Sequence, residues 1–134
     1  MNKLAKSRLK RMLSLTKYEA KRRHLDFNLT INYLLSLLEL QDEKCALTGE
    51  SLEYTAGGNY HRRNPNGVSI DRINNELGYI EGNIQLVRCK VNIIKSDLHN
   101  DEFIDLCYQV VRTDGKKQPL RLLFQDYSCY NISI

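Results

Sequence analysis

Residues 68–97 carry the most specific local pattern of the sequence. The segments 68–73 and 83–87 are short, apolar and rich in β-branched residues, which is typical of strands. Between them, 74–78 is rich in Asn and Gly, residues that tolerate the backbone angles of turns. Helical spacing of apolar residues begins at once in 89–97. The sequence therefore predicts a β-hairpin with a broad connection, followed directly by a short helix.

Helical patterns occur on both sides of the hairpin. Apolar residues recur at helical spacing over 3–24 and 30–41, and Asn28 and Thr30 are both candidates to cap the second of these helices. A last helix is predicted to begin at Asn100. Its apolar face consists of Phe103, Cys107, Val110 and Val111. The expected fold class is α+β.

The positive charge of the chain is concentrated near its N-terminus. The whole chain of 134 residues has a formal charge of +4. Residues 1–26 hold nine Lys or Arg against two acidic residues, a net charge of +7, so residues 27–134 sum to −3. Such a cluster is either a solvated helix surface or a surface that attracts a polyanion such as a phosphate backbone.

Length and charge predict one compact domain with appendages. We expect a basic helical arm over 1–27, a core over 28–113 that contains a long polar loop at 45–68, and a tail over 114–134. No segment is apolar for long enough to span a membrane, and no secretory signal is recognisable. The expected location is therefore the cytoplasm, without membrane association.

Several short motifs follow one another in a set order along the chain. They are Cys45-Ala46-Leu47-Thr48-Gly49, Ser69-Ile70-Asp71-Arg72-Ile73, Gly78-Tyr79, Gly82-Asn83-Ile84, Val91-Asn92 and Lys95. Their order resembles that of the HNH (ββα-metal) endonucleases of phages and mobile elements, over about residues 24–107. The resemblance implies a ββα-metal core of hairpin and helix, flanked by N-terminal helices and a C-terminal helix. It also implies hydrolysis of DNA phosphodiester bonds.

Asp71 and Asn92 are the predicted metal ligands. A carboxylate is a hard oxygen ligand suited to Mg²⁺ or Mn²⁺, and the resemblance implies that Asn92 brings a second oxygen to the same ion. Members of the family often contain a structural zinc ion bound by paired cysteines. The four cysteines here, Cys45, Cys89, Cys107 and Cys129, are scattered without Cys-x-x-Cys spacing. We expect reduced, mostly buried thiols and no structural zinc.

The predicted catalytic residues are Arg72, His61 and Asn83. Arg72 occupies the position of the family's general-base histidine, and an arginine stays protonated at physiological pH, so its expected role is to hold the phosphate. His61 is the leading candidate for the base because histidine titrates near neutrality, although it could instead contact DNA. Tyr54 and Tyr60 are weaker candidates. The resemblance implies that Asn83 holds the hairpin connection by side-chain to backbone hydrogen bonds.

The expected partner is double-stranded DNA, bound by a monomer or a homodimer. The residues predicted to contact it are cationic: Lys6, Lys10, Arg11, Lys17, Lys21, Arg22, Arg62, Arg63 and Lys95. Two alternatives use the same charge: a catalytically inactive HNH-fold protein that only binds nucleic acid, and a ribonuclease.

Overall fold

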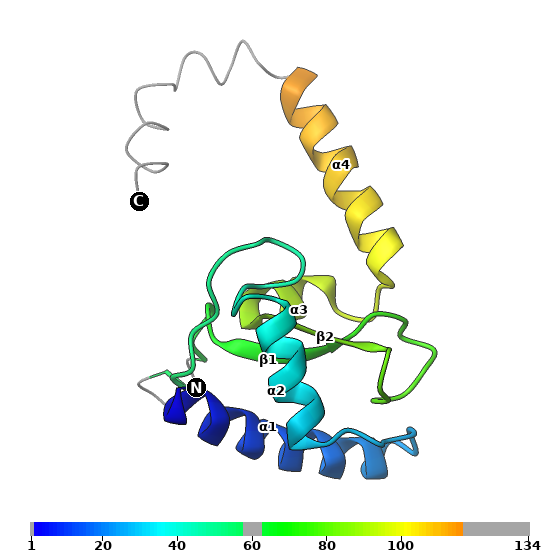
Figure 1. The fold of residues 1–134 in the computed structure, drawn as a ribbon. Helices are drawn as coiled ribbons and strands as arrows, with labels where there is room; N and C mark the ends of the chain where they lie inside the picture. Colours follow the sequence, from blue (N-terminus) through cyan, green and yellow to red (C-terminus); the bar gives the residue numbers. More distant parts are fainter. Residues whose placement is uncertain (1, 58–62, 117–134) are drawn as a thin grey trace. The chain divides into compact units, whose positions relative to one another are not determined.

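The computed structural model describes residues 2–57 and 63–116, which form a mixed α+β structure with four helices and one antiparallel hairpin (Figure 1). The described elements are α1 (Lys3–Arg22), α2 (Ile31–Leu40), β1 (Val68–Arg72), β2 (Ile84–Arg88), α3 (Cys89–Lys95) and α4 (Asn100–Lys116). The α+β class and the order of elements are as predicted, with ends that differ by a few residues.

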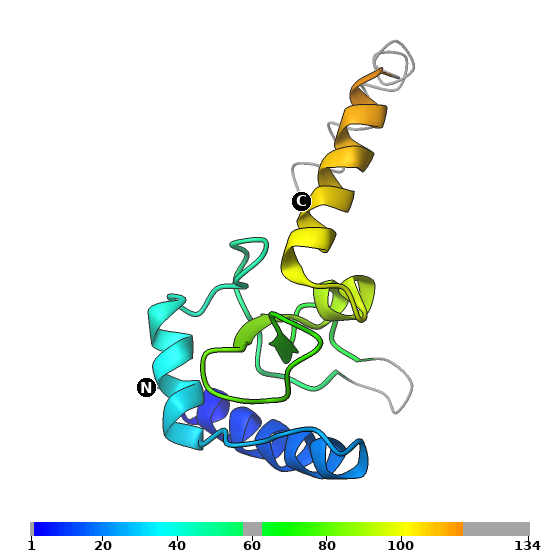
Figure 2. The same cartoon turned by 90° about the vertical axis from the view of Figure 1, so that its right-hand side faces the viewer.

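The two strands pair antiparallel and form the predicted hairpin with a broad connection. Ile70 lies opposite Leu86, and Asp71 lies opposite Gln85. The α1 and α2 helices contact the hairpin on one side and α3 packs on the other (Figures 1 and 2). This arrangement puts β1 in contact with both α1 and α3.

Local chemistry accounts for the α2 helix and its junction with the sheet. The Thr30 hydroxyl caps the helix by accepting a hydrogen bond from Tyr33 N (3.2 Å). Of the two predicted candidates, Thr30 is therefore the cap. At the other end, the Gln41 carboxamide donates to Leu86 O (2.8 Å) and accepts from Leu86 N (3.0 Å). Gln41 therefore pairs with the backbone groups of β2 that face away from β1.

The basic N-terminal helix packs against the rest of the first unit through a few buried side chains. Ala5, Leu9 and Ala20 of α1 are buried against the rest of the fold. By their contacts, the described residues divide into two compact units, of which the first extends to His99 and the second begins at Asn100. The predicted boundaries after residues 27 and 113 stay predictions. Burial of these small apolar side chains explains why α1 belongs to the first unit.

The hairpin connection packs closely on the segment between α1 and α2. A Cβ atom at Gly78 would lie 2.3 Å from the backbone oxygen of Asp26, so only glycine fits there. Next to it, Tyr79 N donates to Asp26 O (2.8 Å) and Asn28 N donates to Tyr79 O (3.1 Å). The close approach of two backbones, and not a turn with positive φ, is the reason for glycine at this position.

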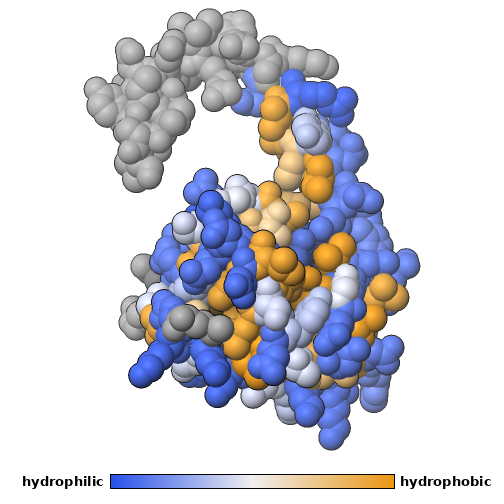
Figure 3. Space-filling view, viewed as in Figure 1, coloured by the Kyte–Doolittle hydropathy of each residue, from blue (hydrophilic) through white to orange (hydrophobic). Residues whose placement is uncertain are grey.

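The α4 helix belongs to the second unit and has an exposed apolar face. Cys107, Val110 and Val111 are solvent-exposed among its described residues, and apolar side chains are visible along the helix in Figure 3. Cys45 and Cys89 are buried free thiols, Cys107 is an exposed one, and Cys129 lies outside the described residues. Two of the three described cysteines are thus buried, as the expectation of mostly buried thiols has it. No described helix has both the length and the apolar character to cross a membrane.

Candidate functional site

Asp71 lies near the end of β1, where a cation and a hydrogen-bond donor contact its carboxylate. Its carboxylate is only 5% exposed, and Lys95 Nζ, from α3, lies 3.0 Å from Oδ2 and 3.3 Å from Oδ1. Gln85, its partner across the hairpin, donates from Nε2 to Oδ2 (2.8 Å). Both strands and α3 thus fix one carboxylate, and its buried charge is compensated by a buried ammonium group.

The position of Lys95 corrects its predicted role as a DNA contact. The residue is 1% exposed, and besides Asp71 its ammonium group donates to Arg72 O (2.7 Å). A phosphate group in solvent cannot reach a side chain in this environment. Lys95 instead joins α3 to the end of β1 and orients the predicted metal ligand.

Asn92 presents its carboxamide to the same end of the hairpin. Its Nδ2 donates to Ser69 Oγ (2.7 Å) and to Ile70 O (3.3 Å). A carbonyl oxygen accepts but does not donate, so this contact fixes which end of the amide faces the strand. Asn92 Oδ1, the atom that could bind a cation, is therefore directed away from β1.

A pocket of about 370 Å³ brings the two predicted ligands together. Asp71 and Asn92 both line it. The other residues of its wall are Arg23, Ile70, Arg72, Asn75, Tyr79, Ile93, Ser96 and Asp97. The pocket thus contains hard oxygen donors and arginine side chains, a combination that suits a cation and a phosphate group in the same place.

The donor set is sparse for a metal ion but has the right chemistry for magnesium. Among the described residues, no group of three or more His, Cys, Asp or Glu side chains could hold an ion. Mg²⁺ is commonly held by one or two protein oxygens, with waters and substrate phosphates completing its shell. Asp71 and Asn92 fit that pattern. An ion bound there would share the Asp71 carboxylate with Lys95.

The Arg72 side chain forms most of its hydrogen bonds with the hairpin connection. Its Nη1 donates to Asn75 O (2.9 Å) and Leu77 O (3.0 Å), and its Nη2 donates to Asn75 Oδ1 (2.6 Å). The guanidinium carbon also lies 5.2 Å from the ring centre of Tyr79. Only its remaining N–H groups are available to a phosphate, so Arg72 shapes the pocket at least as much as it could bind substrate.

Asn83 makes side-chain to backbone hydrogen bonds across the same connection. Its Nδ2 donates to Asn74 O (3.0 Å) and Gly78 O (2.9 Å), while its Oδ1 accepts from Asn74 N (2.9 Å). The two ends of the connection are thereby held together beside Arg72. A contribution of Asn83 to catalysis stays a prediction.

The candidates for the general base are only partly described by the structure. His61, Tyr60 and the predicted DNA contact Arg62 lie outside the described residues. Tyr54 is described, and its hydroxyl donates to Glu43 Oε1 (2.6 Å). Burial and the Glu43 carboxylate raise the pKa of Tyr54 above its ordinary value, so it stays protonated at neutral pH and is a poor base.

The remaining cations predicted to contact DNA are exposed. They are Lys6, Lys10, Arg11, Lys17, Lys21 and Arg22 of α1, and Arg63 of the loop before β1. Arg22 is paired with Glu19 (2.7 Å). Helical spacing puts Lys6, Lys10, Lys17 and Lys21 on one stripe of α1 and puts Arg11 and Arg22 together on an adjoining one.

Three residues of the site were not identified from the sequence. Gln85 could have been inferred from the hairpin register, which puts it opposite Asp71. Arg23 and Asp97 follow the ends of α1 and α3, and both line the pocket. No local pattern distinguishes them from other charged residues at helix ends.

Comparison with known proteins gives a phage relative. The chain is 33% identical over 114 residues to an uncharacterized 29.0 kDa protein, encoded in the dda-modA intergenic region of Enterobacteria phage T4. The match covers 82% of this chain and 42% of the phage protein, so the chain spans less than half the length of this relative. No family model and no solved structure matches the chain.

Proposed function

We propose that this protein is a metal-dependent DNA endonuclease of the HNH (ββα-metal) class, in a variant with arginine in place of the usual histidine. The observation that carries the proposal is the pocket shared by Asp71, Asn92 and Arg72 where β1, the hairpin connection and α3 meet. The hairpin is followed directly by a helix that packs on it, which is the arrangement that the resemblance implies. The likeness of the chain to a T4 protein supports a phage origin.

Each residue of the pocket has a distinct role in this proposal. Asp71 and Asn92 hold one divalent ion, which supplies positive charge against the negative charge that develops on the phosphodiester during cleavage. Lys95 and Gln85 hold the Asp71 carboxylate in one orientation. Positioning of this kind contributes to catalysis because the rate of cleavage falls when metal ligands leave the productive geometry.

The phosphate is held by guanidinium groups. Arg23 lines the pocket from the end of α1, and the remaining N–H groups of Arg72 are available beside it. Donors aimed at the place where negative charge develops stabilise the transition state. The base that activates the attacking water is proposed to be His61.

One observation favours the alternative, an inactive HNH-fold protein that binds nucleic acid. The Lys95 ammonium group lies within 3.3 Å of both Asp71 oxygens and already neutralises the carboxylate. If this ion pair excludes divalent ions, the pocket retains its arginines and loses its metal. The two functions therefore differ in whether an ion binds beside Lys95.

Cleavage of supercoiled plasmid separates the two functions. We expect nicked or linear DNA with Mg²⁺ or Mn²⁺ and intact plasmid with EDTA. Asp71→Asn should abolish cleavage, whereas Asp42→Asn, the same change at an exposed position outside the pocket, should not. Cleavage that persists in Asp71→Asn would contradict the site, and absence of cleavage with intact DNA binding would favour the inactive protein.

A further inference from the structure

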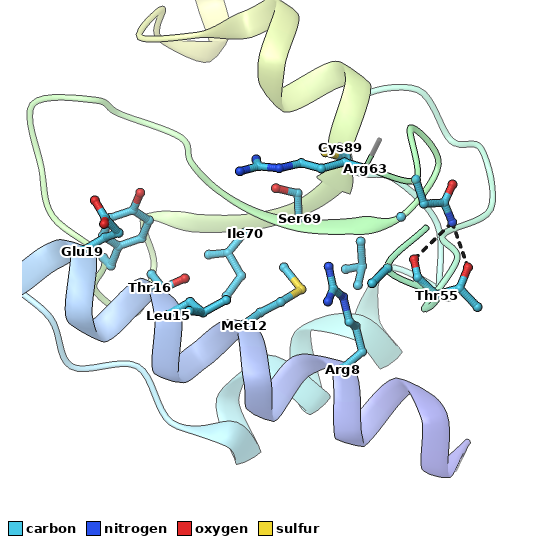
Figure 4. A pocket seen from close by; sticks show the side chains of 15 residues that line it. Arg8, Met12, Leu15, Thr16, Glu19, Thr55, Arg63, Ser69, Ile70 and Cys89 are labelled. Carbon is cyan, nitrogen blue, oxygen red and sulfur yellow. Dashed lines mark hydrogen bonds between the residues drawn. The ribbon is translucent and has the colours of Figure 1, made fainter. Parts of the chain in front are cut away.

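A second pocket adjoins the candidate site along β1. It has a volume of about 310 Å³ and shares Ile70 and Tyr79 with the first pocket, so the two pockets are neighbours, and we refer to them together as the groove. Figure 4 shows the second pocket between α1, β1 and the loop that precedes β1. The groove therefore extends from Asp71 toward the start of β1.

Arginines extend into the groove from both sides. Arg8 points into it from α1 and Arg63 from the loop (Figure 4). Arg23 and Arg72 line the part next to Asp71. The acidic residue of the second pocket, Glu19, is hydrogen-bonded to Arg22, which lowers the pKa of Glu19 and offsets its charge. The other acidic residues of the groove are Asp71, which is paired with Lys95, and Asp97, so the four arginines leave the balance of charge positive.

Arg8 is the most informative of these residues. Its Nε atom is buried and has no hydrogen-bond partner among the described residues. A buried N–H group without an acceptor is unfavourable, so such groups usually have a partner in the functional state. An anion bound in the groove would supply acceptors to the Arg8 guanidinium.

We propose that this groove binds the sugar-phosphate backbone of a DNA strand, and that Arg8 and Arg63 hold phosphates on one side of the phosphate at Asp71. The proposal rests on the proposed nuclease function. The walls also contain Met12, Leu15 and Ile70, apolar groups suited to packing against deoxyribose. A groove that continues past the candidate site favours a polymer over a small phosphorylated ligand, which would need only the first pocket.

This assignment differs from the one that the sequence indicates. Arg8 and Arg23 are absent from the predicted contacts, which include their neighbours Lys10 and Lys21. Residues two positions apart lie roughly 200° apart around a helix, so Lys10 faces away from the groove that Arg8 lines. The groove therefore predicts that Arg8 contributes more to binding than Lys10.

Binding to a short fluorescent DNA duplex in EDTA tests the groove independently of cleavage. Arg8→Gln and Arg63→Gln should each weaken binding by about tenfold, because each loses a charge-assisted contact to phosphate. Each should also lower the slope of log affinity against log salt by about 0.9. Lys10→Gln removes the same charge from the opposite face of α1 and should have a clearly smaller effect.

Arg63 keeps the test interpretable if the Arg8 variant unfolds. Arg63 is exposed and forms no hydrogen bond or ion pair with the described residues, so its substitution should leave the thermal unfolding temperature unchanged. Equal weakening of DNA binding by Arg63→Gln and Lys10→Gln would overturn the proposal that the groove binds DNA. Tighter binding to an RNA duplex of the same sequence would overturn the assignment to DNA.

The outcomes also separate this proposal from the nuclease function. Plasmid that stays intact, together with selective weakening by the groove variants, would overturn the nuclease and leave DNA binding in the groove. Metal-dependent cleavage, together with equal DNA affinity of the groove variants and Lys10→Gln, would overturn DNA binding in the groove and leave the nuclease function.

Discussion

Lys95 and Asp71 form an ion pair in the interior of the protein, with Lys95 Nζ 3.0 Å from Asp71 Oδ2 and the two residues 1% and 5% exposed. The pair joins α3 to the end of β1. A buried charge is tolerated because its partner is close and further hydrogen bonds, from Gln85 and to Arg72 O, satisfy the remaining groups. The same contact that orients the candidate metal ligand therefore also stabilises the fold.

Removal of one partner should be much more harmful than removal of both. Lys95→Met leaves the Asp71 carboxylate buried without its cation and should lower the free energy of unfolding by about 3 to 5 kcal/mol. Asp71→Asn combined with Lys95→Met removes both charges and should recover much of that loss. Urea denaturation of the single and double variants measures the difference.

The double variant also separates stability from activity. It should be folded and still unable to cleave plasmid, because it lacks the carboxylate. Additive losses of stability in the two single variants would contradict a coupled pair.

Arg72→Lys should lower both stability and cleavage. An ammonium group cannot reproduce the fork that reaches Asn75 and Leu77 together, so the connection loses hydrogen bonds worth about 1 to 3 kcal/mol. Circular dichroism melts and plasmid cleavage, measured on the same preparation, test this. Arg112→Lys, at an exposed position of α4, is the matched control. A variant with slower cleavage and an unchanged melting temperature would indicate that Arg72 acts only on phosphate.

Asn83→Ala should destabilise the hairpin connection. The substitution removes its three side-chain hydrogen bonds and leaves the carbonyl of Gly78 without this donor, so we expect a loss of about 3 kcal/mol. Asn32→Ala, at an exposed position of α2, should change stability little. Chemical denaturation of both variants is the measurement, and equal stabilities would contradict the role of Asn83 in the connection.

His61→Ala tests the proposed general base. We expect the cleavage rate at neutral pH to fall by roughly 10² to 10⁴. The variant should also lose the inflection of rate between about pH 6 and 7, where a histidine titrates. If the pH profile of the parent persists in the variant, His61 is a DNA contact and another group activates the water.

Tyr54→Phe should remove a source of instability at alkaline pH. Burial and Glu43 raise the pKa of Tyr54 in the folded state, so the folded protein retains this proton more strongly than the unfolded chain does. The stabilisation is complete below the unfolded pKa of about 10 and is lost as the pH rises toward the higher folded value. The variant should be about 1 kcal/mol less stable at neutral pH. Urea unfolding from neutral to strongly alkaline pH should show a smaller decrease in stability than in the parent.

Local patterns in the sequence were sufficient for the elements of the fold. The turn residues at 74–78 and the apolar segments beside them predicted the hairpin, and Thr30 was one of the two caps expected for α2. Hydrogen bonds and turn preferences of this kind involve residues close in sequence, so they can be recognised without knowledge of the fold.

The sequence by itself determined which residue types are present and in what order, including Asp71, Arg72 and Asn92. Only the tertiary structure decided that Lys95 is buried against Asp71 and that Arg8 lines a groove while Lys10 faces away from it. Helical spacing puts Arg8 and Lys10 on different faces of α1, but the sequence does not say which face borders a groove or that Lys95 is buried. Their environments differ because burial and charge pairing depend on which elements pack against each face of a helix, and those elements come from distant parts of the chain.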